Sequence, residues 1–378
     1  MHLFIVDYFI SLDTLLPIAY FLKKNKQKVS VCNFNILQDF KKNKIVQYLI
    51  NKGVKYIDHQ PLNLSNLILY YLIKFIINFL PKFILKKITR IWFFISRKIN
   101  FLSENKLETF LIKNNIKTLT ISENFPIEKL ERIFLITNKN NIKLFLVPSG
   151  LALNEQKYFS KKINFCDKYF MCNDKLKFKS LEEKKKNKNK LIKFSFFRFE
   201  DEWLKLLDRL FNLNKKKNNN KKIKIAFFVK KGSHWKENES IENLIDQLKQ
   251  NQKFEISIRN KPSDIFPNKI SIFMSDKLNS SEIIDWCDVI IVGRPSSILV
   301  EGIKKDKKVL VLKNNKLINT NFYKYKIFKK IKYENVNQYL TTNFFKKKTD
   351  KKNKKKFLQD FVKFNDHFIK RNLKETYL

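Results

Sequence analysis

The chain is poor in glycine, cysteine and histidine: its 378 residues include five Gly, four Cys and four His. The cysteines form no C-x-x-C pair, which argues against a zinc ribbon or a thioredoxin-like redox motif. The histidines are scattered along the chain, so the sequence shows no zinc constellation. We therefore predict no metal site and reduced, largely buried thiols at Cys32, Cys166, Cys172 and Cys287.

Acidic residues are scarce as well, because 35 Asp and Glu stand against 78 Lys and Arg, giving a net charge of +43. Such an excess suits nucleic acid, anionic lipid or anionic substrates. However, Lys, Asn, Ile and Phe all have AT-rich codons, and base composition explains much of the lysine. The lysine runs at 184–190, 215–222 and 346–356 contain no aromatic rings that could stack on bases. We read them as solvated connectors and predict no nucleic-acid partner.

The sequence also lacks a long uninterrupted apolar run. Residues 62–99 are apolar and aromatic, but Lys74, Pro81 and Lys82 interrupt them, whereas a spanning helix needs about 20 apolar residues. They predict amphipathic helices with basic flanks, suited either to an anionic membrane surface or to packing on the first sheet. Residues 1–6 lack the features of a signal peptide. The expected location is cytoplasmic, and peripheral on the inner membrane face if residues 62–99 bind lipid.

An alternation of apolar strands and helices fills the first half of the chain. Strands are predicted at 2–6, 29–33, 54–58, 118–122, 143–148 and 168–172, the last taken as the final strand of this half. Helices are predicted at 11–24, 45–52 and 127–138. This rhythm predicts an α/β fold with a doubly wound parallel sheet.

The polar run at 212–222 marks the predicted domain boundary. Beyond it, strands at 223–229, 255–259 and 270–274 and helices at 241–250 and 281–286 predict a second α/β domain. The expected organisation is a first domain at 1–211, with residues 62–99 as an insertion, and a second domain at 223–345. Residues 346–378 are expected to form a basic connector and a terminal helix at 357–370.

The most informative motif runs from Asp288 to Gly302 and reads as a buried strand, a small-residue turn and a helix. Ser296 and Ser297 fall at the predicted helix start, where free N–H groups attract anions. Glu301 lies about one turn further on, on the same face. Phosphate held by the serines and a diol held by Glu301 predict a nucleotide site; an ordinary capped helix is the alternative.

This serine–glutamate element resembles the donor half of a GT-B glycosyltransferase. The segments 280–288 and 198–203 resemble bacterial surface-polysaccharide proteins related to CDP-glycerol glycerophosphotransferases and UDP-GlcNAc 2-epimerases. The resemblance implies two Rossmann-like domains facing a cleft, with a last helix that crosses back to the first domain. It also implies a UDP- or CDP-linked donor as substrate, no cofactor and no metal, and a polysaccharide or lipid-linked acceptor.

Three loops of the second domain follow predicted strands, where open α/β sheets bind ligands, and one of them is the loop of Ser296 and Ser297. Lys231 and Gly232 could contact a donor phosphate, although a surface turn is an equal alternative. Arg294 could clamp a diphosphate with two hydrogen bonds. Lys261 stands where the related transferases carry a histidine, and it could neutralise phosphate. The donor-binding residues are therefore predicted as Ser296, Ser297, Glu301, Arg294, Lys231, Gly232 and Lys261.

The first domain should supply the general base. Glu123 follows a predicted strand, as Asp13 does, and a carboxylate at such a place can deprotonate an acceptor hydroxyl. Both could instead cap helices. Ser149 replaces a histidine proposed as the base in the related proteins, which leaves room for a different base or for lost activity. The sequence thus predicts a glycosyltransferase, or a transferase of glycerophosphate-like units. The alternatives are a non-catalytic nucleotide-sugar-binding or scaffold relative and a UDP-GlcNAc 2-epimerase-like enzyme.

Overall fold

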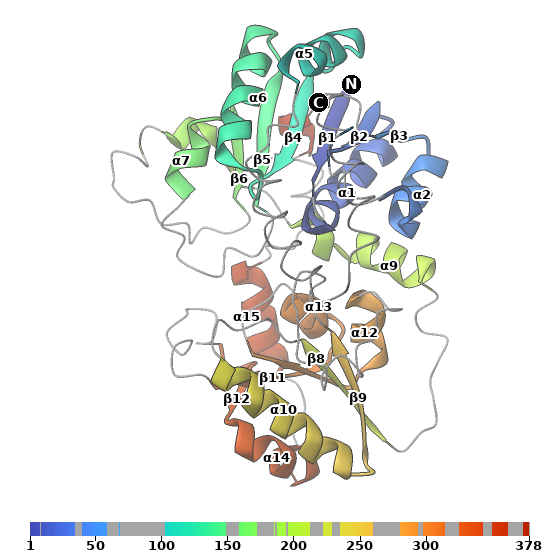
Figure 1. Ribbon diagram of the computed structural model, residues 1–378, viewed down its shortest axis with the longest axis vertical. Helices are drawn as coiled ribbons and strands as arrows, with labels where there is room; N and C mark the ends of the chain where they lie inside the picture. Colours follow the sequence, from blue (N-terminus) through green and yellow to red (C-terminus); the bar gives the residue numbers. More distant parts are fainter. Residues whose placement is uncertain are drawn as a thin grey trace. The chain divides into compact units, whose positions relative to one another are not determined.

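The structure, a computed structural model, divides the chain into two compact units (Figure 1). Unit 1 comprises Met1–Ser149, Gln156–Arg198 and Asn365–Leu378, and unit 2 comprises Gly150–Glu155 and Phe199–Phe364. The structure describes residues 1–7, 9–34, 40–58, 68, 103–148, 159–171, 185, 187–193, 196–211, 222–228, 235–259, 280–293, 298–313, 325–342, 350–361 and 373–377.

Unit 1 is built on a seven-stranded parallel sheet in the order β3-β2-β1-β4-β5-β6-β7. Its strands are β1 (His2–Val6), β2 (Val29–Asn33), β3 (Lys55–Asp58), β4 (Thr118–Ser122), β5 (Lys143–Val147), β6 (Lys168–Met171) and β7 (Leu191–Lys193). Its helices are α1 (Phe9–Lys24), α2 (Lys44–Asn51), α5 (Glu104–Lys113), α6 (Ile127–Lys139) and α7 (Phe159–Ile163). The doubly wound parallel sheet predicted for this half is confirmed.

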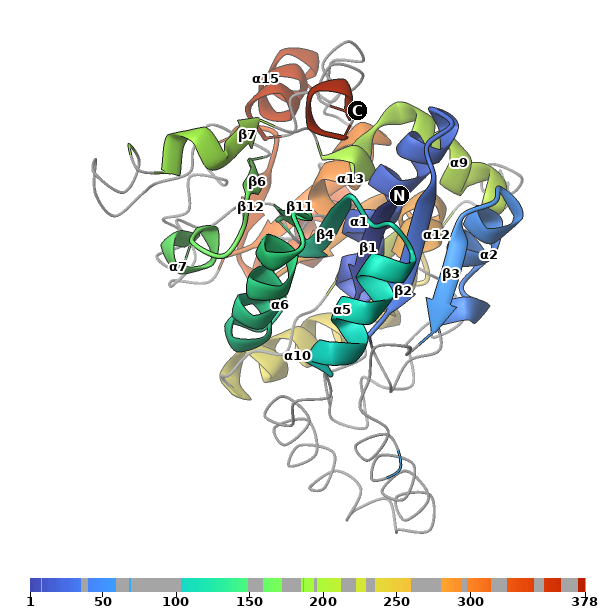
Figure 2. The ribbon, with the colours of Figure 1, turned by 90° about the horizontal axis from the view of Figure 1, so that it is seen from above.

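The two faces of this sheet bury different sets of side chains, because successive residues of a strand point to opposite sides. One face carries Leu3, Ile5, Leu119, Ile121, Leu144 and Leu146, which share a buried cluster with the apolar residues of α5 and α6. Figure 2 shows α5 and α6 on one side of the sheet and α1 on the other. Right-handed crossovers that run in opposite directions from β1 produce this arrangement.

Unit 2 contains a five-stranded parallel sheet in the order β12-β11-β10-β8-β9. Its strands are β8 (Ile223–Phe228), β9 (Phe254–Arg259), β10 (Val289–Val292), β11 (Lys308–Leu312) and β12 (Lys329–Ile331). Its helices are α9 (Asp201–Leu210), α10 (Trp235–Gln250), α12 (Ser280–Trp286), α13 (Ile298–Lys304), α14 (Val336–Thr342) and α15 (Lys351–Phe361). Figure 1 shows α10 and α14 on one side of these strands and α12 and α13 on the other. The expectation of two Rossmann-like units is therefore confirmed.

Helix α13 lies so close to β10 that it requires a glycine at position 302. A Cβ atom added to Gly302 would come within 2.3 Å of the Cδ1 atom of Ile290, a fully buried side chain on the neighbouring strand. A larger residue would require either the Ile290 side chain or α13 to shift. Gly302 thus permits the close packing of the Ile290 side chain against the helix that carries Glu301.

A cysteine and an aspartate precede one strand in each unit and play the same structural part. Asp167 accepts a hydrogen bond from the Leu144 N–H (2.8 Å), and Asp288 accepts one from the Lys224 N–H (2.9 Å). The buried thiols of Cys166 and Cys287 donate to backbone carbonyls, and burial raises the pKa of each to about 12. The prediction of buried, reduced thiols is confirmed for Cys32, Cys166 and Cys287, and Cys172 lies outside the described residues.

Several predicted boundaries need correction. Helix α1 begins at Phe9 rather than at Ser11, and β7 follows the strand that we took to be the last of unit 1. Helix α15 begins inside the lysine run that we read as a connector, because lysine is a good helix former and Asp350 accepts a hydrogen bond from the Asn353 N–H. Helix α5 was not predicted at all.

The division between the units also differs from the expected one. Helix α9, which we assigned to the first domain, belongs to unit 2. Its Asp201 and Asp208 pair with Lys304 and Lys305 at the end of α13. These ion pairs attach α9 to the second sheet, and the polar run at 212–222 therefore lies within unit 2 rather than between the units.

The end of the chain, Asn365–Leu378, belongs to unit 1, whereas α15, the described part of the predicted last helix, belongs to unit 2. Tyr377 lies in a helical turn of residues 373–377 and is buried against the rings of His2, Phe4, Phe145 and Phe170. Its hydroxyl lies 3.0 Å from the Thr120 hydroxyl. The last residues therefore complete the core of unit 1 on the face opposite α5 and α6.

Two predicted segments are not available for comparison. Residues 62–99, with the exception of Ile68, and the predicted strand at 270–274 lie outside the described residues. Within the part of the chain that the structure describes, no helix is long and apolar enough to cross a membrane.

Candidate functional site

The sheet of unit 1 changes winding direction between β1 and β4. From β1 the chain proceeds through β2 and β3 to one edge, whereas from β4 it proceeds through β5 and β6 toward the other. Open α/β sheets bind ligands at the carboxyl ends of the strands at such a point. Ile5 of β1 is paired with Ile121 of β4. Asp7 and Glu123 each lie two residues after this pair, so they lie at the same end of the sheet.

Asp7 is buried directly beyond β1. Its Oδ1 atom accepts a hydrogen bond from the Ser11 hydroxyl at 2.5 Å. Burial raises the pKa of the Asp7 carboxyl to about 6, although the Ser11 hydrogen bond and the positive charges of Lys129 and Lys162 act in the opposite direction. Asp7 is therefore a stronger base than an exposed aspartate, with a proton affinity suited to catalysis near neutral pH.

Glu123 is held by partners on both its backbone and its side chain. The Tyr169 hydroxyl donates to its Oε2 atom at 2.6 Å, and its N–H donates to the Val147 carbonyl at 2.8 Å. The Lys162 ammonium donates to the backbone carbonyls of Glu123 and, at 3.0 Å, of Phe125. These contacts fix the direction of the Glu123 carboxylate, which is partly exposed.

Strand periodicity explains why Asp7 and Glu123 lie on the same face of the sheet. Asp7 and Glu123 have odd numbers, as do the residues of β1 and β4 that face α5 and α6. Lys129 lies in the first turn of α6, and Lys162 lies on α7. Two acids beyond adjacent strands and two lysines from the helices that follow β4 and β5 thus gather at one end of the sheet.

Both lysines are partly buried, and this burial disfavours their charged forms. Burial lowers the pKa of Lys129 and of Lys162, even though Asp7 and Glu128 act to raise both values and Glu123 also raises that of Lys162. Both side chains remain partly exposed. The ammonium groups of Lys129 and Lys162 are therefore only partly solvated.

Asp13, our second predicted base, has other surroundings. Because α1 begins at Phe9, Asp13 lies in the second turn of the helix and cannot cap its start. Its carboxylate is exposed and lies 3.6 Å from the Arg198 guanidinium. The structure thus gives Asp13 an ion pair within unit 1 and brings Asp7, not Asp13, to the group around Glu123.

The sheet of unit 2 changes direction between β8 and β10, whose last residues, Phe228 and Val292, are paired in register. The predicted donor loops follow these two strand ends. The side chains concerned lie outside the described residues: Lys231, Gly232, Lys261, Arg294, Ser296 and Ser297. Ser149 lies outside them as well. Their assignments stay predictions.

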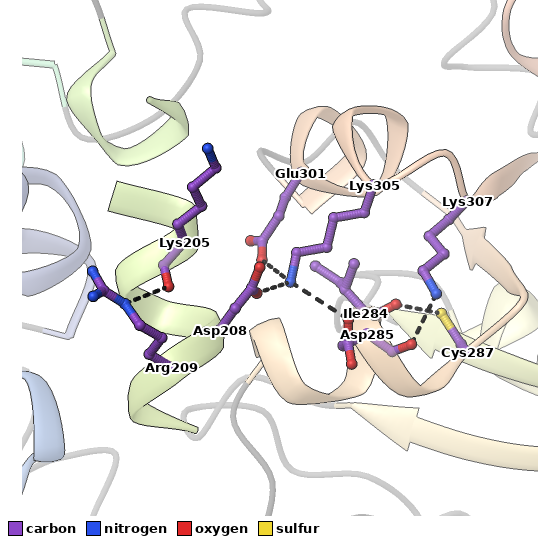
Figure 3. A network of polar contacts seen from close by, with 9 residues as sticks. All are labelled: Lys205, Asp208, Arg209, Ile284, Asp285, Cys287, Glu301, Lys305 and Lys307. Carbon is purple, nitrogen blue, oxygen red and sulfur yellow. Dashed lines mark hydrogen bonds and ion pairs between the residues drawn. The ribbon is translucent and has the colours of Figure 1, made fainter. Parts of the chain in front are cut away.

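Glu301 is the described member of the predicted donor set, and Figure 3 shows it in a network of charged side chains. The Lys305 ammonium lies 3.9 Å from the Glu301 carboxylate, 2.7 Å from that of Asp208 and 3.9 Å from that of Asp285. The Glu301 side chain is only 5% exposed. One cation therefore holds together three acids from α9, α12 and α13, and its position fixes that of Glu301.

The arrangement in unit 1 has the components of an acid–base site. A buried carboxylate of raised pKa, a second carboxylate held by a tyrosine, and two cations lie at the expected ligand-binding end of the sheet. Such a group can remove a proton from a hydroxyl and stabilise negative charge. Among the described residues, no three His, Cys, Asp or Glu side chains are arranged to hold a metal ion.

Sequence reasoning missed four members of this group: Asp7, Lys129, Lys162 and Tyr169. The signal for Asp7 was present, since it directly follows a buried strand, which is the criterion that selected Glu123. The lysines gave no signal, because they are two among 78 basic residues. Tyr169 lies within a buried strand, and only the pairing of β5 with β6 brings it near Glu123.

Comparisons with known proteins give the fold. No family model and no curated protein sequence matches the chain. The UDP-GlcNAc 2-epimerase of Methanocaldococcus jannaschii is similar in structure, with a TM-score of 0.56 at 11% identity over 99% of each chain. The S. aureus protein MnaA in complex with UDP has a TM-score of 0.54 at 11% identity over 98% of this chain and 94% of MnaA.

A glycosyltransferase is similar to the same extent. Spinosyn forosaminyltransferase SpnP has a TM-score of 0.53 at 10% identity, covering 99% of this chain and 98% of that protein. At such identities the likeness shows a shared architecture, which is that of the GT-B proteins, and leaves the activity open.

Proposed function

We propose that the chain is a transferase that moves a sugar, or a glycerophosphate-like unit, from a nucleotide-activated donor to a hydroxyl-bearing acceptor of surface polysaccharide or lipid-linked type. The observation that carries this proposal is the group formed by Asp7, Ser11, Glu123, Lys129 and Lys162 at the point where the sheet of unit 1 changes direction. Transfer to a hydroxyl needs a base, and this group provides one on a two-unit fold that is shared with nucleotide-sugar enzymes.

In this proposal Asp7 is the general base. It takes the proton of the acceptor hydroxyl as the acceptor oxygen attacks the donor, and the nucleotide leaves with the bonding electron pair. Ser11 orients the Asp7 carboxylate. Glu123, which we first favoured as the base, is occupied by the Tyr169 hydroxyl, and we assign it to binding the acceptor.

Unit 2 is proposed to bind the donor. Glu301 accepts hydrogen bonds from the ribose hydroxyls, with Lys305 holding its carboxylate in place. The phosphates are assigned to Arg294, Lys231, Gly232, Lys261, Ser296 and Ser297, as the sequence predicts. No cofactor or metal takes part in this proposal; cations and backbone N–H groups stabilise the leaving nucleotide.

A UDP-GlcNAc 2-epimerase-like activity is a second candidate, and the pairing of carboxylates favours it. Proton removal from a carbon and its replacement on the opposite face require two acid–base groups. Asp7 and Glu123 follow adjacent, paired strands and so supply two carboxylates at the same end of the sheet. The two candidates differ in product, because an epimerase returns a nucleotide sugar or its elimination product without an acceptor.

The experiment is a binding and turnover series on the whole chain. Thermal unfolding is measured with UDP, CDP, GDP and CMP, since a ligand that binds the folded state raises the midpoint by mass action. The nucleotide that binds then selects the donor sugars for a release assay with and without acceptor alcohols. We expect one nucleotide to shift the midpoint in wild type and in Asp7→Asn, and to lose most of that shift in Glu301→Ala.

Release of nucleotide that depends on acceptor establishes the transferase, and release or isomerisation without acceptor establishes the second candidate. Binding of a nucleotide with no turnover of any matching donor supports the non-catalytic alternative. Failure of every nucleotide to shift the midpoint contradicts the assignment of unit 2 as a donor-binding unit.

A further inference from the structure

Helix α15 is attached to unit 2 by one of its two faces. The centre of the fully buried Phe357 ring lies 5.3 Å from that of Tyr325 and 5.1 Å from that of Phe328. The Lys354 ammonium pairs with the Asp306 carboxylate just beyond the end of α13. Figure 1 shows α15 beside α13, on the side of the sheet opposite α10 and α14. These contacts fix which side of α15 faces the protein.

The opposite face of α15 carries four exposed lysines. Because successive helical residues turn by about 100°, positions 351, 352, 355 and 356 share one side of the helix, away from Phe357 and Lys354. All four side chains are exposed, and the fifth exposed side chain described on α15 is Gln359. We call the four lysines together the basic face: Lys351, Lys352, Lys355 and Lys356.

Few acids are available to balance these charges. Residues 346–361 contain eight lysines and two aspartates. Asp350 caps the start of α15, where it accepts a hydrogen bond from the Asn353 N–H at 3.1 Å. Asp360 lies within α15, and its side chain is outside the described part of the chain. Even with both aspartates counted against the lysines, a large positive excess remains on this stretch.

The high lysine content of the chain does not by itself explain the basic face. Helices α5, α6, α9 and α10 belong to the same lysine-rich chain, and each of them carries at least two acids among its basic residues. On α6, Arg132 and Lys139 pair with Glu104 and Glu108 of α5. Helix α15 differs from these helices, because its four exposed lysines have no acid between them in the sequence.

The basic face makes the helix that carries it less stable. Lys351 and Lys355 are four residues apart, as are Lys352 and Lys356, and like charges at this spacing repel each other. Lys351 and Lys352 also lie in the first turn, where the helix dipole disfavours cations. A negatively charged surface placed against this face would relieve both effects.

We propose that the basic face of α15 docks on a membrane surface that contains anionic phospholipid. A cluster of about four or more lysines on an amphipathic helix is attracted by the negative potential of such a surface. Among the exposed side chains described on α15 none is apolar, so the helix rests on the headgroups and does not insert into the acyl chains. This inference goes beyond the proposed function and does not depend on it.

Nucleic acid is a less suitable partner for this face. Proteins that bind single strands stack the bases on aromatic rings, and the exposed side chains described on α15 include no ring. Arginine, whose guanidinium matches phosphate geometry with two hydrogen bonds, is absent from α15. Lysine ammonium groups on flexible stems suit the diffuse attraction of a headgroup layer instead. RNA is therefore included in the test as a competing ligand.

The test measures cosedimentation of the full chain with vesicles at about 0.1 M salt. One set of vesicles contains equal parts of phosphatidylglycerol and phosphatidylcholine, and the other contains phosphatidylcholine alone. We expect the wild type to bind only the first set and to be released at about 0.5 M salt, where the charges are screened. Binding of the wild type to neither set overturns the proposal.

The decisive variant combines Lys351→Gln, Lys352→Gln, Lys355→Gln and Lys356→Gln. Glutamine is a good helix former, so α15 should persist, which circular dichroism checks. Binding should weaken by about 100-fold or more, since each lysine near an anionic surface contributes about fivefold. The variant with arginine at the same four positions keeps the charges and should bind as the wild type does.

The matched control changes four exposed lysines of unit 1 to glutamine: Lys26, Lys28, Lys42 and Lys113. It removes the same amount of charge and should bind the vesicles nearly as the wild type does. An equal loss in both glutamine variants overturns the docking surface and leaves diffuse attraction by a chain of net charge +43. Binding that survives in the α15 variant overturns it as well, because another part of the chain then holds the membrane.

Two further readouts separate this inference from its alternatives. RNA that displaces the wild type from vesicles at lower concentration than the lipid, through the same four lysines, overturns the lipid assignment. Nucleotide binding is measured by thermal unfolding without vesicles. Vesicle binding that depends on the four lysines, with no nucleotide bound, supports docking and removes the donor assignment; nucleotide binding without vesicle binding does the reverse.

Discussion

A titratable side chain is buried at each end of β1, but the two side chains have different surroundings. His2, at the start of the strand, accepts or donates a hydrogen bond with the Thr118 hydroxyl at 2.8 Å and is covered by the ring of Tyr377. Asp7, just beyond the end, is bonded to Ser11 and lies near two partly exposed lysines. Aromatic side chains cover His2, whereas charged side chains lie near Asp7.

This contrast separates structural burial from functional burial. Burial lowers the pKa of His2 to about 4 and raises that of Asp7 to about 6, so both groups are pushed toward their neutral forms. At the His2 end, neutrality serves packing, because the charged imidazolium would be buried under Tyr377. At the Asp7 end, the same effect produces a base that titrates close to neutral pH.

The largest expected effect comes from opening the sealed end. Tyr377→Ala removes the ring that contacts His2, Phe4, Phe145 and Phe170, and it should destabilise unit 1 by about 3–5 kcal/mol. Tyr377→Phe keeps the ring and loses only the contact with Thr120, for about 1 kcal/mol. Hydrogen exchange of peptides from β1 and β4 measures both. Equal protection in Tyr377→Ala and wild type would show that the end of the chain does not stabilise this sheet.

The second effect concerns pH. The pKa of His2 falls from 6.5 to about 4 on folding. The folded state therefore becomes less stable as the pH falls through that range, because the unfolded chain takes up a proton first. Asp7, whose pKa rises from 3.8 to about 6 on folding, has the opposite effect. It makes the folded state more stable as the pH falls over nearly the same range, because the folded form takes up a proton first. The two contributions, each about 3 kcal/mol, should largely cancel in the wild type.

Single substitutions should separate the two contributions. In His2→Asn the Asp7 contribution remains, so unit 1 should become more stable as the pH falls from about 6 to about 4. In Asp7→Asn the His2 contribution remains, and the stability should fall over the same interval. Hydrogen exchange of the β1 peptide across this pH range is the measurement. If stability changed with pH in the same direction in both variants, the pKa shift of either His2 or Asp7 would be contradicted.

A smaller effect tests the charged network of unit 2. Lys305→Met leaves the carboxylates of Asp208, Asp285 and Glu301 without their shared cation, and we expect a loss of about 2 kcal/mol. Trp203 on α9, Trp235 on α10 and Trp286 on α12 report unfolding of unit 2 by fluorescence in a Trp92→Phe background.

Lys249→Met is the control for that network, because Lys249 pairs with Asp246 on α10 in an exposed setting. Exposed pairs of this kind contribute less than about 0.5 kcal/mol. A Lys305→Met variant as stable as Lys249→Met would show that the network does not hold Glu301 in place.

Except for β7 and β12, the strands of both sheets could be predicted, because buried parallel strands are continuous apolar runs, as in β4, β5 and β10. Elements that depend on tertiary contacts were harder. Strand β7 has three residues and forms only by pairing with β6, and α15 begins in a lysine run without an apolar face at its start. Helix α9 lies within the range 1–211 that we assigned to the first domain, but it belongs to unit 2, where its Asp201 and Asp208 pair with Lys304 and Lys305.

The candidate site could be predicted only in part for a related reason. Glu123 was found because an acid at a strand end is a local pattern, and Asp7 shows the same pattern. The pairing of Tyr169 with Glu123 and the approach of Lys162 to the end of β4 join residues about 40 positions apart. Contacts at that separation depend on strand order, which no local pattern specifies.

The most direct test of the central claim, that Asp7 is the base, is the pH profile of kcat/KM for acceptor-dependent nucleotide release in Asp7→Asn and Glu123→Gln. We predict that the wild type loses activity below a pKa of about 6 and that Glu123→Gln keeps this limb at a lower maximum. Asp7→Asn should lose activity by about 100-fold or more, together with the limb. An acid limb that persists in Asp7→Asn and disappears in Glu123→Gln would contradict the account.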